Sequence, residues 1–88
     1  MTRYRIENVE SKRPGHPNKW HERVTGKICT VETMEWGEMG YLVVEGLVNH
    51  RYGDLPTRYR TSPVRKTVEK DDVLTIETEN SVYTLRVV

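Results

Sequence analysis

The sequence predicts an all-β fold: a small single-domain barrel, SH3-like or OB-like, of five to six antiparallel strands with two long loops. β-branched residues, which suit a pleated surface, make up 25 of the 88, whereas Ala, the strongest helix former, is absent. No segment keeps a helical period, and several short runs alternate apolar with polar residues. Only 35% of the residues are hydrophobic. A closed barrel lets this small set fill one interior and leaves no open sheet edge, so residues 1–88 are expected to form one domain.

The N-terminal part of the chain predicts one strand followed by a loop. Tyr4 and Ile6 alternate with charged residues, which is typical of a half-buried strand over 4–9. The following stretch, 10–19, is polar and contains two prolines and a glycine. Because proline fixes φ and lacks a backbone donor, we expect a long surface loop there.

Two further strands are expected in the middle of the chain. The second covers 24–34, where Gly26 allows a bend or bulge near its start. The third covers 41–45, within the most continuously apolar run of the sequence. Residues 35–40 between them are expected to turn, and Gly46 predicts another bend after the third strand.

The C-terminal part predicts a second long loop and then a meander. Residues 49–57 contain Gly-Asp and Pro, which indicate turns. Pro63 is expected at the edge or start of a strand, because proline cannot donate to a sheet ladder. Strands are expected over 64–69, 73–78 and 82–88, joined by short polar turns.

Charge and cysteine content narrow the functional classes. The formal net charge is +1, and two basic blocks, 1–27 and 51–66, alternate with two acidic blocks, 28–50 and 67–88. This balance argues against dominant nonspecific binding to nucleic acid. No run approaches the ~18 apolar residues of a membrane helix. The single cysteine, Cys29, cannot form an internal disulfide, so we expect a cytoplasmic protein with this side chain packed in a strand.

The titratable residues do not form a recognisable catalytic or metal motif. The histidines and the cysteine lack the paired spacing of a zinc site; they are His16, His21, His50 and Cys29. The six glycines are too dispersed for a phosphate-binding loop. We therefore expect a protein that is not an enzyme and that uses no metal or cofactor.

Two C-terminal motifs carry a resemblance to a known group of proteins. Residues 60–64 read Arg-Thr-Ser-Pro-Val, and residues 78–85 read Thr-x-Asn-Ser-Val-Tyr-x-Leu. This pairing resembles small uncharacterised proteins encoded by phages and prophages of bacteria, and the stretch 15–29 fits the same group. The resemblance implies a viral or mobile-element setting and transfers no catalytic residue.

The leading hypothesis is a non-enzymatic binding module of phage or prophage origin that acts by protein–protein contact. Its expected surface combines loop-borne aromatic, flexible and acidic side chains: Glu35, Trp36, Glu38, Met39 and Trp20. Trp20 is also a candidate plug over one end of the barrel. The expected partner is a host or viral protein, and inhibition of a host defence component is a narrower form of the hypothesis.

Two alternatives stay open. A nucleic-acid-binding barrel is one, because arginines interleaved with tyrosines hold phosphates and stack on bases. Its residues are Arg51, Tyr52, Arg58, Arg60, Arg65 and Lys66. Strand alternation also explains part of this cluster without a ligand, since an inward Tyr59 places Arg58 and Arg60 outward. The other alternative is a self-associating structural protein, in which an edge strand pairs between chains.

Overall fold

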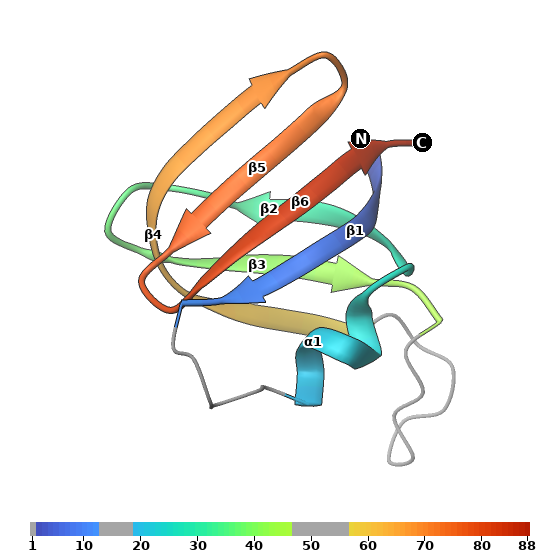
Figure 1. Cartoon of the computed structure of the whole chain (residues 1–88), viewed down its shortest axis with the longest axis horizontal. Helices are drawn as coiled ribbons and strands as arrows, with labels where there is room; N and C mark the ends of the chain where they lie inside the picture. The colour runs from blue at the N-terminus through green and yellow to red at the C-terminus, as the bar shows by residue number, and fades with distance from the viewer. Residues whose placement is uncertain (1, 13–18, 47–56) are drawn as a thin grey trace.

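The computed structural model describes residues 2–12, 19–46 and 57–88, and for residues 19–21, 33 and 57 the backbone only. Its elements in chain order are β1 (Arg3–Ser11), α1 (Lys19–Val24), β2 (Ile28–Thr33), β3 (Met39–Val44), β4 (Thr57–Lys70), β5 (Val73–Thr78) and β6 (Ser81–Val87). The strands wrap around one interior, and the two ends of the chain lie side by side where β1 meets β6 (Figure 1).

The six strands form a closed antiparallel barrel. Their hydrogen-bonded order is β1-β2-β3-β4-β5-β6, and β6 pairs again with β1. This confirms the predicted all-β barrel. Because every strand pairs with its neighbours in sequence, the order is an up-and-down meander, which differs from the Greek-key order of an OB-like barrel.

The barrel interior is filled by side chains that alternate inward from the strands, together with one from α1. In the described part of the chain the buried hydrophobic residues are Tyr4, Ile6, Val24, Cys29, Leu42, Val44, Val64, Ile76, Tyr83 and Leu85. The predictions that Tyr4 and Ile6 share a buried face and that Cys29 packs in a strand are confirmed. Burying each large aliphatic side chain stabilises the fold by about 1.5–3 kcal/mol, so this set supplies most of the driving force for folding.

The segment before β2 is helical, which corrects the predicted strand over 24–34. α1 is a short helix that ends at Val24, whose side chain is fully buried. Gly26, with φ +86°, turns the chain after the helix, and its N–H donates to the Ile6 carbonyl at 2.6 Å. The predicted bend at Gly26 is therefore present, but it separates a helix from the strand that begins at Ile28. A helix of six residues is too short to reveal a 3.6-residue period in the sequence.

β4 is one 14-residue strand that changes partner along its length. Its first part pairs with β3 as far as Pro63, opposite Met39, and its second part pairs with β5 from Val64 onward. Pro63 therefore lies within β4, and the prediction that it stands at the edge or start of a strand is wrong. Proline is tolerated here because it stands where one ladder ends and the next begins.

The predicted C-terminal meander is confirmed. Asp71 and Asp72 join β4 to β5 as a two-residue turn in which both residues have positive φ, 51° and 64°. Residues 79–80 turn the chain from β5 into β6. The bounds of the two predicted loops are partly wrong, because residues 10–11 continue β1, residue 19 begins α1 and residue 57 begins β4. The rest of the predicted loops over 10–19 and 49–57, apart from residue 12, lies outside the described residues.

Candidate protein-binding surface

The connection between β2 and β3 is a tight turn that carries Trp36. The Glu38 N–H donates to the Glu35 carbonyl at 3.1 Å, which closes a four-residue β-turn over 35–38. Gly37 holds the third position with φ +81°. A type II turn requires this left-handed conformation there, and glycine adopts it without steric cost. This is the turn that the sequence predicts within 35–40.

Backbone hydrogen bonds hold the turn against β4. The Gly37 N–H donates to the Val64 carbonyl at 2.7 Å, and the Val64 N–H donates to the Glu38 carbonyl at 2.8 Å. Trp36 forms a parallel bridge with Val64, whose side chain is buried in the barrel. The turn lies beside β4 in Figure 1. The backbone of Trp36 is thus positioned by a core strand rather than by a free loop.

Trp36 presents its side chain to solvent from this anchored turn. It is 74% exposed, and Met39 is 41% exposed. An open pocket of about 400 Å³ lies beside them, and its lining residues are Gly37, Glu38, Met39, Tyr41 and Pro63. These five residues together with Glu35 and Trp36 are called the turn surface below.

The pairing of β3 with β4 assembles this pocket. Met39 stands opposite Pro63 in the ladder, and the register shifts between Met39 and Tyr41. At the shift the Gly40 N–H donates to the buried hydroxyl of Thr61 at 2.9 Å. This contact ties the irregular end of β3 to β4 and brings Met39, Tyr41 and Pro63 around one space.

The turn surface has an uneven charge distribution. At one border the Arg58 Nε donates to a Glu32 carboxylate oxygen at 2.8 Å, and its guanidinium carbon lies 3.9 Å from the centroid of the Tyr41 ring. Glu35 and Glu38 are exposed, and within the described residues neither forms an ion pair. The arrangement is an apolar patch with an unneutralised acidic rim.

Trp20 is carried by an element that lies away from the turn surface. α1 packs against β1, whereas the β2–β3 connection lies on the other side of the barrel in Figure 1. The structure describes only the backbone of Trp20. Its two predicted roles, barrel plug and interface anchor, therefore both stay predictions.

Two arginines of the predicted nucleic-acid-binding cluster are engaged within the molecule. Arg58 is held by Glu32, and the Arg65 Nη2 lies 3.8 Å from a Glu79 carboxylate oxygen. These pairs leave less positive charge for phosphates than the sequence suggests. Two further members of the cluster lie outside the described residues: Arg51 and Tyr52.

The remaining members of that cluster are dispersed along β4. Arg60 and Lys66 are exposed, but the point where β4 changes partner from β3 to β5 lies between them. Tyr59 is half-buried, and its hydroxyl lies 3.2 Å from that of Tyr83. Its ring meets the Tyr83 ring edge to face, with centroids 6.2 Å apart. Tyr59 is therefore part of the inner packing, as the alternation predicts, and does not serve as an open platform for a base.

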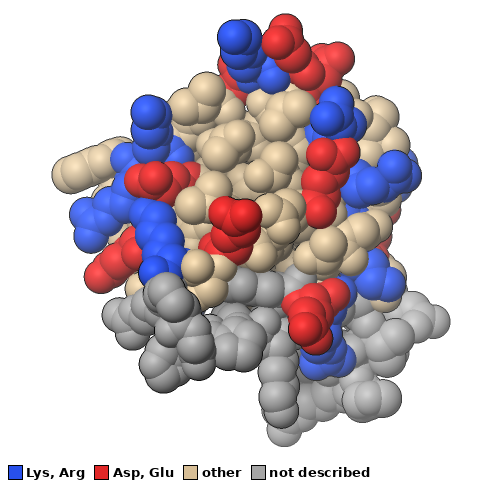
Figure 2. Space-filling model, viewed as in Figure 1, with Lys and Arg blue, Asp and Glu red and all other residues tan. Residues whose placement is uncertain are grey.

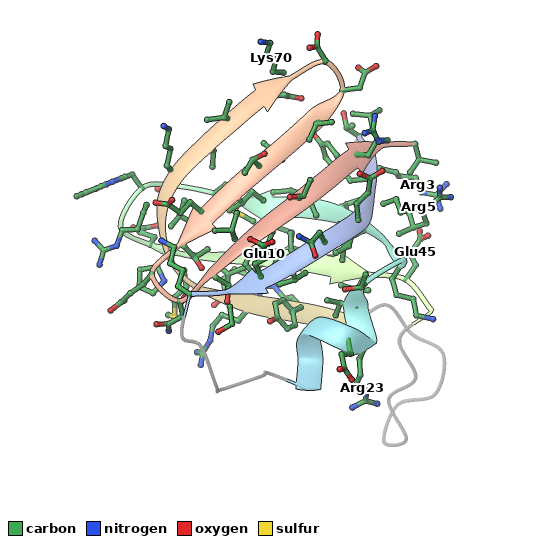
Figure 3. All side chains as sticks on the ribbon, in the orientation of Figure 1. Arg3, Arg5, Glu10, Arg23, Glu45 and Lys70 are labelled. Atoms are coloured by element: carbon green, nitrogen blue, oxygen red, sulfur yellow. The ribbon has the colours of Figure 1, made fainter. Side chains whose placement is uncertain are left out.

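The described residues bring the two basic blocks near each other at Lys12, which pairs with Glu77 at 3.4 Å, and Glu77 stands opposite Lys66 in the β4–β5 ladder. The described arginines of β1 lie apart from β4. β1 carries the exposed Arg3 and Arg5, and β1 stands opposite β4 in the ring of strands. Arg3 is itself paired with Glu45 at 2.6 Å, and the two side chains lie close together in Figure 3. On the face drawn in Figure 2, basic and acidic side chains are interspersed. That face offers no broad region of one charge.

The buried titratable side chains belong to the core. Burial, followed by the nearby Glu45 carboxylate, raises the pKa of Cys29 to about 11, so its thiol is protonated at neutral pH. Burial also raises the pKa of Tyr83, and the hydrogen bond with Tyr59 acts in the same direction. Across the described ranges, no group of three His, Cys, Asp or Glu side chains could hold a metal ion.

The sequence did not identify Tyr41 and Pro63 as members of the surface. Alternation gives a signal for Tyr41, since an inward Leu42 and Val44 predict an outward residue at 41 and 43. Pro63 gives no local signal, because its contribution depends on the register between β3 and β4.

A comparison of the chain with protein-family models, curated proteins and solved structures finds no match in any of the three. The resemblance of the C-terminal motifs to phage-encoded proteins therefore stays an expectation. Within residues 2–12, 19–46 and 57–88, no helix is long and apolar enough to cross a membrane.

Proposed function

We propose that this protein is a non-enzymatic binding module that contacts another protein through the turn surface. The observation that carries the proposal is the 74% exposure of Trp36 on a turn fixed by backbone hydrogen bonds to β4. Tryptophan is enriched among the residues that dominate binding energy at protein interfaces. A position fixed in advance also reduces the entropy lost on binding.

Burial of Trp36 and its neighbours by a partner would supply a substantial free energy. At ~25 cal/mol per Å² of apolar area, covering most of an exposed indole contributes about 2–4 kcal/mol. Met39 adds a flexible side chain that adapts to an uneven partner surface. The open pocket beside them offers a place for one projecting side chain of the partner.

The proposal includes the setting that the C-terminal motifs imply. In this form the chain is encoded by a phage or prophage, acts in the cytoplasm of the host, and binds a host or viral protein. Its narrower form is that the bound protein belongs to a host defence system and that binding inhibits it. These parts rest on the resemblance, whereas the contact surface rests on the geometry.

The two other readings have less support. Arg58 and Arg65 are engaged by carboxylates, which weakens the case for a nucleic-acid surface on β4. Self-association by edge pairing would need a free strand edge, and the described strands close on themselves. Nucleic-acid binding and self-association remain the two alternative functions.

The test is partner capture with a matched pair of variants. The tagged protein, Trp36→Ala and the control Val68→Ala are incubated with bacterial lysate, with and without nuclease. Val68 is 44% exposed on β4 and outside the turn surface, so its variant also loses exposed apolar area. We expect the same proteins on the wild type and on Val68→Ala, and their loss on Trp36→Ala.

Either of two results would contradict the proposal. Trp36→Ala retaining the same captured proteins, with an unchanged circular-dichroism spectrum, would show that the turn surface is not used. Capture that disappears on nuclease treatment would instead indicate a nucleic-acid bridge and favour the Arg/Tyr cluster.

A further inference from the structure

We infer that the turn surface recognises a basic peptide segment, with an Arg or Lys side chain on Trp36 and an apolar side chain in the neighbouring pocket. This inference rests on the proposed function and adds the chemistry of the partner. It follows from three features of the surface: its unneutralised acids, its open aromatic ring and the lining of its pocket.

Glu35 and Glu38 are two of the seven described acidic side chains that form no ion pair with a described residue, and they are the two beside the exposed Trp36. On the barrel wall, five carboxylates are paired with cations: Glu7, Glu32, Glu45, Glu77 and Glu79. Arg58, whose guanidinium lies over the Tyr41 ring, is already held by Glu32. The exposed Arg60 stands opposite Tyr41 in the ladder, away from the turn itself. Charge complementarity therefore favours a cationic partner at the rim.

The aromatic rings of the surface suit the same partner. The Tyr41 ring already carries a guanidinium, that of Arg58, at 3.9 Å from its centroid. Trp36 has the better ring for binding a cation, and within the described residues no cation stacks on it. An arginine or lysine placed there would contact the indole face and lie near the carboxylates of Glu35 and Glu38.

The pocket supplies the apolar part of the recognition. Met39, Tyr41 and Pro63 line it with mostly apolar surface, and Gly37 contributes no side chain to the lining. An apolar residue adjacent to the partner's cation would fill this space. A partner that carries phosphates is disfavoured at the turn. Its negative charges would be repelled by the two carboxylates of the rim, and the described residues of the turn carry no cation to offset this repulsion.

The experiment is fluorescence anisotropy with four labelled peptides of about ten residues, a length too short for a stable isolated helix. The first combines arginines with leucines, the second replaces the arginines by glutamates, the third replaces them by glutamines, and the fourth replaces the leucines by serines. A short single-stranded oligonucleotide is measured in parallel. Each is titrated at ~50 and ~200 mM salt, because exposed charge pairs weaken as ionic strength rises.

We expect the arginine–leucine peptide to bind roughly tenfold more tightly than the glutamine peptide, as two exposed ion pairs and one cation–π contact allow. The glutamate peptide should bind more weakly still. Glu35→Gln/Glu38→Gln should remove the preference for arginine over glutamine, and Trp36→Ala should abolish binding. The matched control is Asp71→Asn/Asp72→Asn, which removes the same charge at the β4–β5 turn and should leave the preference intact.

Several outcomes would overturn the inference, and they leave the proposed function distinguishable. Equal binding of the arginine and glutamine peptides, both lost in Trp36→Ala, would keep the protein-binding surface and reject the basic partner. Absence of binding by every peptide would reject the basic partner as well, while the capture experiment still decides the proposed function. Binding of the oligonucleotide alone would reject both.

Discussion

The Ser62 hydroxyl donates to the Thr78 hydroxyl oxygen at 2.7 Å, and this bond joins in space the two C-terminal motifs of the sequence. The Asn80 N–H donates in turn to the Ser62 hydroxyl oxygen at 3.1 Å, and the Ser81 N–H donates to that of Thr78 at 3.1 Å. Thr78 also donates to the Ser81 carbonyl at 3.0 Å. The motif residues thus fasten the β5–β6 turn to β4, which explains their pattern as structural.

Removing the Thr78 hydroxyl is expected to destabilise the barrel. Thr78→Val keeps the shape of the side chain but leaves the Ser62 hydroxyl and the Ser81 N–H without their partner. Unsatisfied buried polar groups cost about 1–3 kcal/mol each, so we expect the free energy of unfolding to fall by about 2–3 kcal/mol. Urea denaturation followed by circular dichroism measures it.

The matched control is the same substitution on the other face of β5. Thr75→Val changes a residue whose side chain makes no hydrogen bond within the described residues. We expect it to alter the free energy of unfolding by less than about 0.5 kcal/mol, as a partly exposed position allows. Equal effects of the two substitutions would show that the Ser62–Thr78 bond has no special role.

The β4–β5 turn holds two aspartates in a conformation that favours glycine. Asp72 has φ 64° and Asp71 has φ 51°, as a type I′ turn requires, and Asn-Gly is the preferred pair there. Asp71→Asn/Asp72→Gly should stabilise the protein by about 0.5–1 kcal/mol. Asp72→Ala removes a charge as well but keeps a β-carbon at positive φ, so it should not stabilise. A thermal melt of the three proteins compares them, and stabilisation by Asp72→Ala would show that charge rather than conformation limits the turn.

The buried thiol should make stability fall in alkaline solution. The pKa of Cys29 is raised to about 11 in the folded protein from an ordinary value of 9.0. Below pH 9 the thiol is protonated in both states. Between these two values the unfolded chain loses the proton first, so the free energy of unfolding falls by up to about 3 kcal/mol as pH rises. Denaturation curves from pH 8 to pH 11 measure the slope.

The Cys29→Ala variant provides the comparison for this pH dependence. It lacks the titrating group, so its alkaline slope should be shallower than that of the wild type, although a smaller core side chain lowers its stability at every pH. Parallel curves for the two proteins would contradict the assigned shift. Tyr83, whose pKa is also raised by burial, contributes to both proteins equally.

Trp36 is expected to matter for binding and little for stability. Because its side chain is 74% exposed, Trp36→Ala should change the free energy of unfolding by less than about 0.5 kcal/mol. Leu42→Ala, a core truncation, should instead cost about 2–5 kcal/mol. Urea titrations of both variants check this contrast. A loss for Trp36→Ala as large as that for Leu42→Ala would make the indole a structural residue.

The sequence predicted the parts of the fold that local alternation controls. The meander from 64 to 88 follows from alternating runs and turn residues, and closure into a barrel follows from the cost of exposed sheet edges. α1 was missed because a helix of six residues shows no period. The sequence does not predict that β4 continues through Pro63. A proline is tolerated there because the ladder with β3 ends at this residue and the ladder with β5 begins at the next one, and this pairing leaves no local signal.

The candidate surface was predictable only in part. Trp36, Met39 and their flanking glutamates stand together in the sequence, and the structure keeps them together on one turn. Tyr41 and Pro63 join them through the register of β3 with β4, and the anchoring of the turn on Val64 is equally long-range. Such contacts have no counterpart in composition or spacing.

The most direct measurement is a chemical-shift titration of the ¹⁵N-labelled protein with its captured partner. The Trp36 indole N–H, assigned by its loss in Trp36→Ala, serves as the reporter. Binding through the turn surface predicts that this signal and the amides of residues 35–41 and 64 shift most. Unshifted signals in this region, with shifts on α1 or on the exposed arginines of β4 instead, would contradict it.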